Sequence, residues 1–294
     1  MKVVGIGGGH GLARTLRAAR LYADEVEAVV TVADDGGSSG RLVRELGIPA
    51  PGDIRNCLVA LSDDIDLGAL FQHRFCRGAL AGHALGNLVI AALAEREGDF
   101  GRAVERAGEL LGAKGRVHPA TTTTVSLHAR VRNGEINGQV AVARTNHPIQ
   151  AVYLQPPEPP AYGPAVAAIE SADQVVLGPG SLFTSLIATL LVPGLRAALQ
   201  RSGARRVFVC NLKMQPGETE GLDAAAHVGA LLAHVGAYAV DVVLVQVPPL
   251  PGGGLSIERA ALDHYGLEIV EADLAAADGG HDPARLAEAL SALV

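Results

Sequence analysis

Aromatic residues are scarce in this chain of 294 residues: they make up 3% of it, and tryptophan is absent. The interior must therefore be built from alanine, valine, leucine and glycine. The hydrophobic fraction of 49% supplies enough of these residues for a large core. The length alone allows one domain or two.

Cysteine is also rare, and long apolar runs are missing. Cys57, Cys76 and Cys210 are far apart and form no CxxC or Cys/His spacing, which excludes a disulfide framework and a zinc site of the usual kind. No stretch of about 18 uncharged apolar residues occurs, so we expect no membrane span. The first residues lack the charged and apolar regions of a signal peptide. These features predict a protein of the reducing cytoplasm.

Clustered basic residues are missing as well. The net charge is −7, and the arginines are scattered along the chain. A basic patch is the electrostatic footprint of a nucleic-acid-binding protein, so we expect no nucleic-acid partner.

What is present is an alternation of apolar runs with amphipathic stretches. The alternation predicts a doubly wound, mostly parallel α/β sheet of the Rossmann-like type, with a crevice at the carboxyl ends of the strands. Strands are expected at 2–6, 26–33, 174–178, 205–210, 240–247 and 267–272, with helices between them and a closing helix at 283–294.

The middle of the chain departs from this alternation. Residues 54–110 are predicted to be mostly helical, and 121–145 alternate by two as a β-ribbon does, with turn pairs at Asn133-Gly134 and Asn137-Gly138. A proline-rich segment, 155–164, leads back to the sheet. We therefore predict one domain over 1–294, with a helical and β-ribbon elaboration at about 54–160.

A glycine loop, GGGHG at 7–11, follows the first strand. Gly8, Gly9, His10 and Gly11 lie where backbone N–H groups can face a phosphate at a helix N-terminus. The strict G-x-G-x-x-G spacing is broken, because His10 stands at its last glycine position. A tight turn without a ligand is the alternative interpretation.

The stretch TVADDGGSSGR at 31–41 ends the second strand with two acids. Asp34 and Asp35 are placed to bind a ribose hydroxyl, or a divalent cation such as Mg²⁺ that bridges to phosphate oxygens. A solvated turn is the alternative, since Asp-Gly is common in turns. Ser38, Ser39 and Arg41 add hydroxyls and a positive charge for a ligand.

Three further motifs carry polar residues. In PGDIRN, Asp53, Arg55 and Asn56 are candidate ligand contacts, and a helix start with Asp53 as its N-cap is the structural interpretation, which can hold as well. In GPGSLFTS, a second glycine turn supplies Gly180 and Ser181, while CNLKMQPGET supplies Asn211 after a strand. No Ser/His/Asp order or nucleophile elbow is present, so no catalytic residue is assigned.

Taken in order, GGGHG, TVADDGGSSGR, PGDIRNCLVAL, GHALGNLVIAAL, LGPGSLFTS and CNLKMQPGET resemble the YvcK (gluconeogenesis factor) branch of the CofD-like proteins. The resemblance covers nearly the whole chain. ADDGGSSGR together with PGDIRN is its most specific part.

The resemblance implies a Rossmann-like core that binds UDP-sugars such as UDP-N-acetylglucosamine. It also implies a regulatory role in growth on gluconeogenic carbon sources, cell shape and cell-wall synthesis, with cell-wall synthesis proteins as partners. No reaction is assigned to that branch, and no cofactor is required. The related CofD branch is a magnesium-dependent transferase that moves a phospholactyl-type group from a guanosine-diphosphate-linked donor to a deazaflavin. There Asp34 and Asp35 match acceptor and metal positions.

The chain departs from the family pattern at several positions. His10 replaces a threonine of the first loop, Lys213-Met214 alter the CNL…QPGET turn, and Gly280 stands where an arginine is common before HDP. Tyr265 matches a family position and is a candidate for stacking on the ligand.

Three functions from different classes follow. The first is a UDP-sugar-binding regulatory protein, and the second is a transferase of the CofD type. The third is a nicotinamide-dependent oxidoreductase, which the broken glycine motif disfavours. A homodimer is expected from the fold type.

Overall fold

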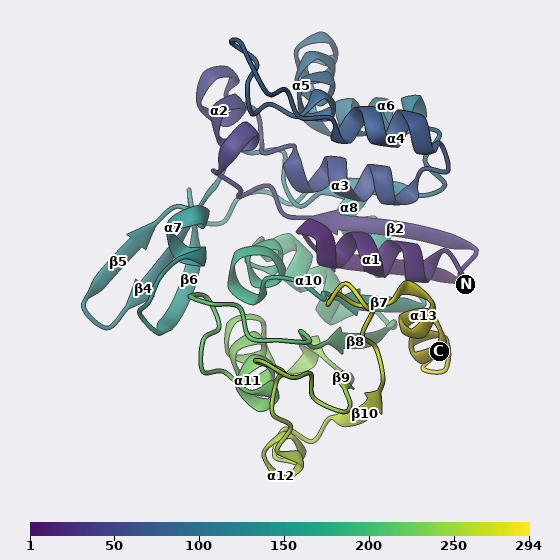
Figure 1. Ribbon diagram of the computed structural model, residues 1–294, viewed down its shortest axis with the longest axis vertical. Coiled ribbons are helices and arrows are strands. Elements are labelled where there is room, and N and C mark those ends of the chain that lie inside the picture. Colours follow the sequence, from purple (N-terminus) through teal and green to yellow (C-terminus); the bar gives the residue numbers. More distant parts are fainter.

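A seven-stranded sheet forms the centre of the protein in the computed structural model, which describes all 294 residues (Figure 1). Every neighbouring pair in this sheet is parallel. In spatial order its strands are β10 (Glu268–Ala272), β9 (Val242–Gln246), β8 (Arg205–Val209), β7 (Gln174–Leu177), β1 (Lys2–Gly7), β2 (Glu25–Val30) and β3 (Arg116–Pro119).

Helices cover both faces of the sheet. Helix α1 packs against α3 and α13 on one face, and α8 packs against α10 on the other (Figure 1). The helices are α1 (Gly9–Ala19), α2 (Gly37–Leu46), α3 (Gly52–Leu61), α4 (Ile65–Gln72), α5 (Leu85–Glu97), α6 (Phe100–Leu110), α7 (Gln139–Ala143), α8 (Gly163–Glu170), α9 (Ala188–Leu190), α10 (Pro193–Arg201), α11 (Ala224–Val235), α12 (Arg259–Asp263) and α13 (Pro283–Ser291), with a π-helical segment η1 (Leu182–Ile187) and a 3₁₀ turn η2 (Ala237–Ala239).

The direction of strand addition reverses between β1 and β7. From β1 the chain adds β2 and β3 on one side, and from β7 it adds β8, β9 and β10 on the other. In open α/β sheets such a switch point opens a crevice beyond the carboxyl ends of the strands, because the loops there diverge to opposite faces. The predicted doubly wound, mostly parallel fold is therefore confirmed.

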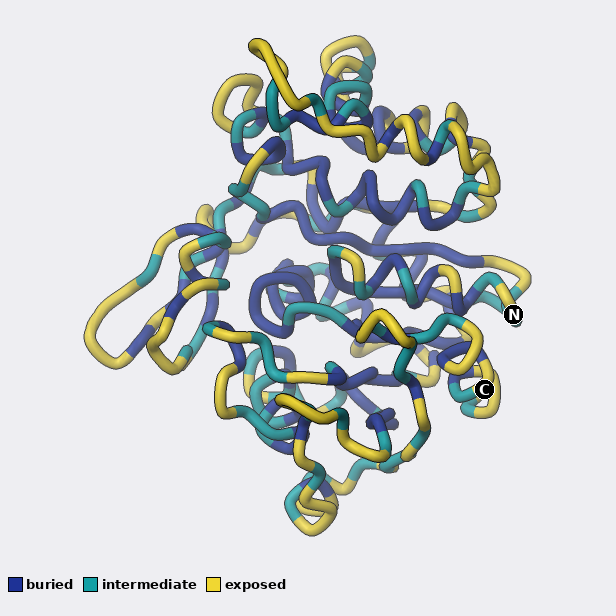
Figure 2. Tube along the Cα trace, in the orientation of Figure 1, coloured by how far each residue is buried: buried dark blue, intermediate teal, exposed yellow.

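The local sequence explains why these elements form. The central strands are rich in valine and are almost wholly buried, as expected for strands covered on both faces. Several helices begin at an aspartate whose carboxylate accepts a backbone N–H of the first turn, namely Asp99, Asp223 and Asp282. One contiguous core runs between the sheet and both helical layers, and the exposed residues lie mainly at the outer turns (Figure 2).

The middle of the chain contains a second, three-stranded antiparallel sheet. Its strands are β4 (Ser126–Val131), β5 (Gly134–Asn137) and β6 (Ile149–Gln155). Turn residues at 132 and 133 join β4 to β5, close to the predicted Asn133-Gly134 turn. Residues 139–143, predicted as ribbon, instead form the short helix α7, which begins after Gly138.

Two strands of the middle were not predicted. β3 is part of the main sheet, although residues 116–119 fall inside the predicted elaboration. Its sequence, RVHP, is short and partly charged, so it has no apolar run to mark it. β6 pairs with β4 and completes the small sheet.

No single helix is long and apolar enough to cross a membrane. One pair, Leu182–Leu190 with Pro193–Arg201, meets the length and composition criteria only when both parts are taken together, and it is bent by 75°.

Candidate functional site

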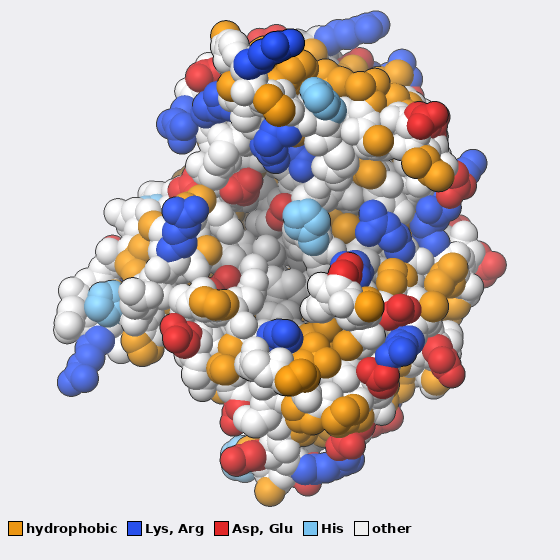
Figure 3. Space-filling view, in the orientation of Figure 1, with side chains coloured by type: hydrophobic (Ala, Val, Ile, Leu, Met, Phe, Trp, Pro, Cys, Tyr) orange, Lys and Arg blue, Asp and Glu red, His pale blue; other side chains and the backbone are white.

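Four loops meet at the carboxyl edge of the main sheet, following β1, β2, β7 and β8. The space-filling view shows a hollow at this edge (Figure 3). Helices α2 and α3 lie on one side of it and the small sheet on another, as comparison with Figure 1 shows. Most residues that the sequence singles out lie in these loops, so the structure brings them together.

The first glycine loop is shaped by close contacts. A Cβ atom at Gly8 would stand 2.3 Å from Oδ2 of Asp53, and one at Gly11 would stand 2.2 Å from the carbonyl oxygen of Pro179. Neither position can hold a larger residue without displacing a neighbour. Gly9 has φ of +63° with nothing close to it, and His10 beside it is exposed. The open part of this loop is therefore Gly9 and His10, at the N-terminus of α1.

The second glycine loop follows β7 and is bound by side chains of the β8 loop. The Gly180 amide donates to Oδ1 of Asn211 at 3.1 Å, and the Gln215 side-chain amide donates to the Ser181 hydroxyl at 3.0 Å. From α1, the Thr15 hydroxyl donates to the Gly178 carbonyl at 2.7 Å. The loop is thus held in place by hydrogen bonds from both sides of the switch point.

A buried carboxylate, Glu218, occupies the start of the η1 segment. It accepts hydrogen bonds from the Phe183 amide at 2.7 Å, the Thr184 amide at 2.8 Å and the Thr184 hydroxyl at 3.0 Å. Burial raises the pKa of Glu218, which these bonds partly offset. The helix start after β7 is therefore capped from within the protein, and its first amides are not free for a phosphate.

The two acids after β2 point to different partners. Asp34 accepts the Gly36 amide at 2.9 Å and a hydrogen bond from Ser39, and burial raises its pKa. Asp35 accepts the Val140 amide at 2.9 Å. It thereby caps helix α7 of the elaboration. Asp34 is the member of the pair that lies with the other polar residues of the cleft.

Asp53 lies in the first turn of α3, but it is not the N-cap that the sequence suggests. The N-cap residue is Pro51, and no side chain caps this helix. The Asp53 carboxyl instead faces the first glycine loop, beside Gly8. Burial and the neighbouring charge of Asp34 raise the pKa of Asp53 to about 7. Asp34 and Asp53 thus form a coupled pair of carboxyls at the cleft.

Arg55 lies beside these acids, and two asparagine side chains accept hydrogen bonds from its guanidinium. Its Nη1 donates to Oδ1 of Asn87 at 2.7 Å and its Nη2 to Oδ1 of Asn56 at 2.9 Å, while its buried Nε has no partner. Asn87 donates onward to the Ser38 hydroxyl at 3.0 Å. Burial lowers the pKa of Arg55, and no carboxylate forms an ion pair with it. The guanidinium is positioned by neutral groups next to two acids.

Two predicted ligand contacts, Arg41 and Tyr265, have other partners in the structure, and the departure at Gly280 has a neighbour that bears on it. The Arg41 guanidinium donates a hydrogen bond to the Ala81 carbonyl at 2.8 Å, so it is held by the backbone between α4 and α5. The Tyr265 hydroxyl lies against Gly229 in the middle of α11, and Tyr265 precedes the start of β10, away from the carboxyl edge. The structure does not bring Tyr265 to the cleft. A Cβ at Gly280 would stand 2.6 Å from Cζ of Arg14, so a guanidinium from α1 lies beside the position where the resemblance implies an arginine.

The family model described as 2-phospho-L-lactate transferase CofD matches residues 3–280 of this chain. This chain belongs to the CofD family. The curated relatives include the gluconeogenesis factor of Halalkalibacterium halodurans, 44% identical over 84% of this chain and 78% of that protein. The putative gluconeogenesis factor of Mycobacterium tuberculosis strain H37Rv is 44% identical over 98% of this chain and 89% of its own length.

A solved structure agrees with the fold throughout. The crystal structure of a UPF0052-family protein from Bacillus halodurans superposes with a TM-score of 0.95, at 37% identity, over 98% of each chain. The resemblance to the gluconeogenesis-factor branch of the CofD-like proteins is therefore confirmed. The names of these relatives describe those proteins, and the ligand of this family member is a separate question.

Two polar residues of this family member were not singled out as site residues from the sequence. Glu218 stands in a Pro-Gly-Glu-Thr turn, which is a turn motif by default, and its role depends on amides 34 and 35 residues away. Asn87 stands inside the GHALGNLVIAAL motif, and its contact with Arg55 spans 32 residues. No local sequence pattern identifies these two residues, because the groups that they bind lie more than 30 residues away in the chain.

Proposed function

We propose that this protein binds a nucleotide sugar of the UDP-sugar type in the cleft at the β1/β7 switch point and acts as a cytoplasmic regulatory protein. The observation that carries the proposal is the convergence of two glycine loops and a pair of coupled carboxyls, Asp34 and Asp53, at one crevice. A nucleotide is the ligand class that open α/β sheets bind at such a point. The names of the curated relatives, which are gluconeogenesis factors, support a role in growth on gluconeogenic carbon sources. We further propose that this role serves cell shape and cell-wall synthesis.

The charges in the cleft limit how the ligand can bind. Asp34 and Asp53 would repel a bare diphosphate, and burial followed by the charge of Asp34 already raises the pKa of Asp53. The start of η1 is filled by Glu218, so its amides do not offset this repulsion. The Gly9 backbone already hydrogen-bonds to Asp53, so the phosphates need the N-terminus of α1 at His10, together with a cation.

A magnesium ion fits the donors that are present. Mg²⁺ is usually held by one or two carboxylates together with substrate phosphates, and Asp34 and Asp53 supply two hard oxygen ligands. No group of three His, Cys, Asp or Glu residues could hold a metal without the ligand. The predicted ligand pair was Asp34 and Asp35. Asp35 already binds Val140, so we propose Asp53 as the second carboxylate.

A thermal-shift and calorimetric panel tests the proposal. The protein is titrated with UDP-N-acetylglucosamine, UDP-glucose, GDP and NAD, each with and without Mg²⁺. A ligand at one hundred times its dissociation constant stabilises the native state by about 2.7 kcal/mol, which is measurable. We expect a shift with the UDP-sugars, and a weaker shift in Asp34→Asn and Asp53→Asn. The absence of any UDP-sugar binding at millimolar concentration would overturn the proposal.

A transferase of the CofD type is the second candidate. It is favoured by Asp53, because a carboxyl with a pKa of about 7 can accept a proton from an attacking hydroxyl at neutral pH. In that case Mg²⁺ would neutralise the phosphates of a GDP-linked donor. A shift with GDP and Mg²⁺ but not with UDP-sugars would favour this candidate.

We also propose that the protein forms a homodimer. Light scattering of the same samples checks this.

A further inference from the structure

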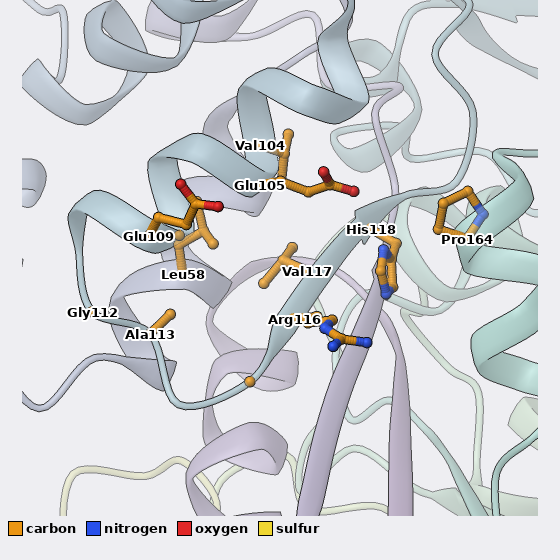
Figure 4. A pocket seen from close by; sticks show the side chains of 12 residues that line it. Leu58, Val104, Glu105, Glu109, Gly112, Ala113, Arg116, Val117, His118 and Pro164 are labelled. Atoms are coloured by element: carbon orange, nitrogen blue, oxygen red, sulfur yellow. The ribbon is translucent and has the colours of Figure 1, made fainter.

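A groove separate from the cleft runs along the outer edge of the main sheet. It has a volume of ≈ 500 Å³, and one wall is made by four consecutive residues, Gly115 to His118. Consecutive residues of a strand point to opposite faces, so a pocket that touches all of them lies at the strand edge rather than on a face. The opposite wall is a face of α6 (Figure 4). The lining residues from that face are Val104, Glu105, Gly108 and Glu109, and Gly112 from the turn after α6 adds to them.

The strand in this wall, β3, is the end strand of the sheet. It pairs with β2 on one side only. The Ala120 amide donates to the Val30 carbonyl, and backbone groups alternate along a strand, so those of His118 also face β2. The N–H and C=O of Val117 therefore face outward into the groove. Unpaired groups of this kind are a template for a further strand.

The groove is acidic on the side of the helix. Glu105 has one partner, the Tyr162 hydroxyl at 3.3 Å, and no cation pairs with it. Glu109 is paired only with the exposed Arg106. On the strand side, Lys2 and Arg116 lie 3.0 and 3.7 Å from the single carboxylate of Glu27. Glu105 is thus the acid on the wall facing β3 that has no cation beside it, while Glu109 has only an exposed partner.

His118 adds an unsatisfied group to the lining. Its Nε2 lies 2.6 Å from the Glu27 carboxylate, and the side chain is 5% exposed. Its Nδ1 is buried and has no hydrogen-bond partner in the protein. A ligand group that hydrogen-bonds to Nδ1 would remove the cost of leaving this buried polar atom unpaired.

We propose that the groove binds an extended, basic peptide segment of a partner protein, which adds to the sheet as an eighth strand beside β3. The peptide backbone would pair with Val117, and its lysine or arginine side chains would face Glu105 and Glu109. This mode of recognition takes its affinity from main-chain hydrogen bonds and its selectivity from alternate side chains. The groove lies between α6 and the end strand β3 and shares none of the cleft residues, so partner docking does not require that the cleft be empty.

The test uses a fluorescein-labelled peptide of alternating lysine and valine with blocked ends, and fluorescence anisotropy at physiological salt. Two comparison peptides are a version with alternate amides N-methylated and a version with glutamate in place of lysine. We expect the N-methylated and acidic peptides to bind at least about tenfold more weakly, because one loses main-chain pairing and the other is repelled. Hydrogen exchange of the Val117 amide should slow when the first peptide binds.

Matched protein variants separate the groove from the overall negative charge. The double variant E105Q/E109Q should bind the basic peptide about tenfold more weakly. The control E95Q/E258Q removes two exposed acids elsewhere and should bind it as the unmodified protein does. Equal weakening in both variants, equal binding of the N-methylated peptide, or no protection at Val117 would overturn the proposal.

Discussion

A Cβ atom at Gly8 would stand 2.3 Å from Oδ2 of Asp53, so the glycine loop after β1 and the first turn of α3 fit together only without a side chain at residue 8. The contact joins two motifs, GGGHG and PGDIRN, through residues that are 45 positions apart in the chain. It also fixes Asp53 at the N-terminus of α1, where the cleft begins. Four predictions follow from this and related contacts.

The first prediction concerns Gly8→Ala. The added methyl group must displace Asp53, so we expect unfolding to become easier by about 1–3 kcal/mol, the usual cost of overpacking. Urea unfolding followed by circular dichroism measures the change. Gly203→Ala is the control, because nothing lies within 4 Å of the Cβ position at Gly203. A variant at residue 8 as stable as the control would show that the loop adapts freely.

The second prediction concerns the pH dependence of stability. The pKa of Asp53 is raised to about 7 in the folded protein, so between about pH 4 and 7 the native state binds more protons than the unfolded state. Stability must then fall as the pH rises through this window, with a slope of at most about 1.4 kcal/mol per pH unit for one proton. Below the window this penalty is absent, and above pH 7 it is complete.

Urea unfolding at pH 5 and pH 7.5 measures this effect. We expect Asp53→Asn to lose part of the decline, because it cannot ionise. An equal decline in the variant and the unmodified protein would assign the pH dependence to other groups. Asp99→Asn serves as a control, since Asp99 is the N-cap of α6 and lies outside the four loops of the cleft.

The third prediction concerns Glu218→Ala. Removing the carboxylate leaves the buried amides of Phe183 and Thr184 without partners. Each unpaired buried donor costs about 1–3 kcal/mol, so we expect a loss of at least about 2 kcal/mol in total. Glu220→Ala is the matched control, because Glu220 is exposed two residues away. Thermal unfolding of both variants gives the comparison, and equal midpoints would contradict the capping role.

The fourth prediction concerns Asp35→Ala. The substitution removes the acceptor of the Val140 amide and so releases helix α7 from the turn after β2. We expect faster hydrogen exchange in α7 and the adjoining small sheet, with no change in β1 or β7. Glu45→Ala, an exposed acid on α2, is the control. If exchange rises equally in the main sheet, Asp35 stabilises the whole domain rather than the junction.

The fold could be predicted from the sequence because its determinants are local. Buried parallel strands are apolar runs, and helices between them are amphipathic, so six of the seven strands of the main sheet are visible in the printed sequence. The exception, β3, has only four residues and two of them are charged or ionisable. Its place in the sheet follows from pairing with β2, a contact across more than 80 residues.

The motifs that lie at the cleft could also be found in the sequence, since each follows the end of a strand. The sequence by itself determined the strand–loop–helix order, the glycine turns and the family. It could not determine the partner of each side chain. Only the tertiary structure decided that Asp34 lies with Asp53 while Asp35 turns to Val140, and that Glu218 fills the start of η1. The reason is physical: elements form through neighbours in the chain, whereas the charge and hydrogen bonds of a cleft depend on groups that only folding brings together.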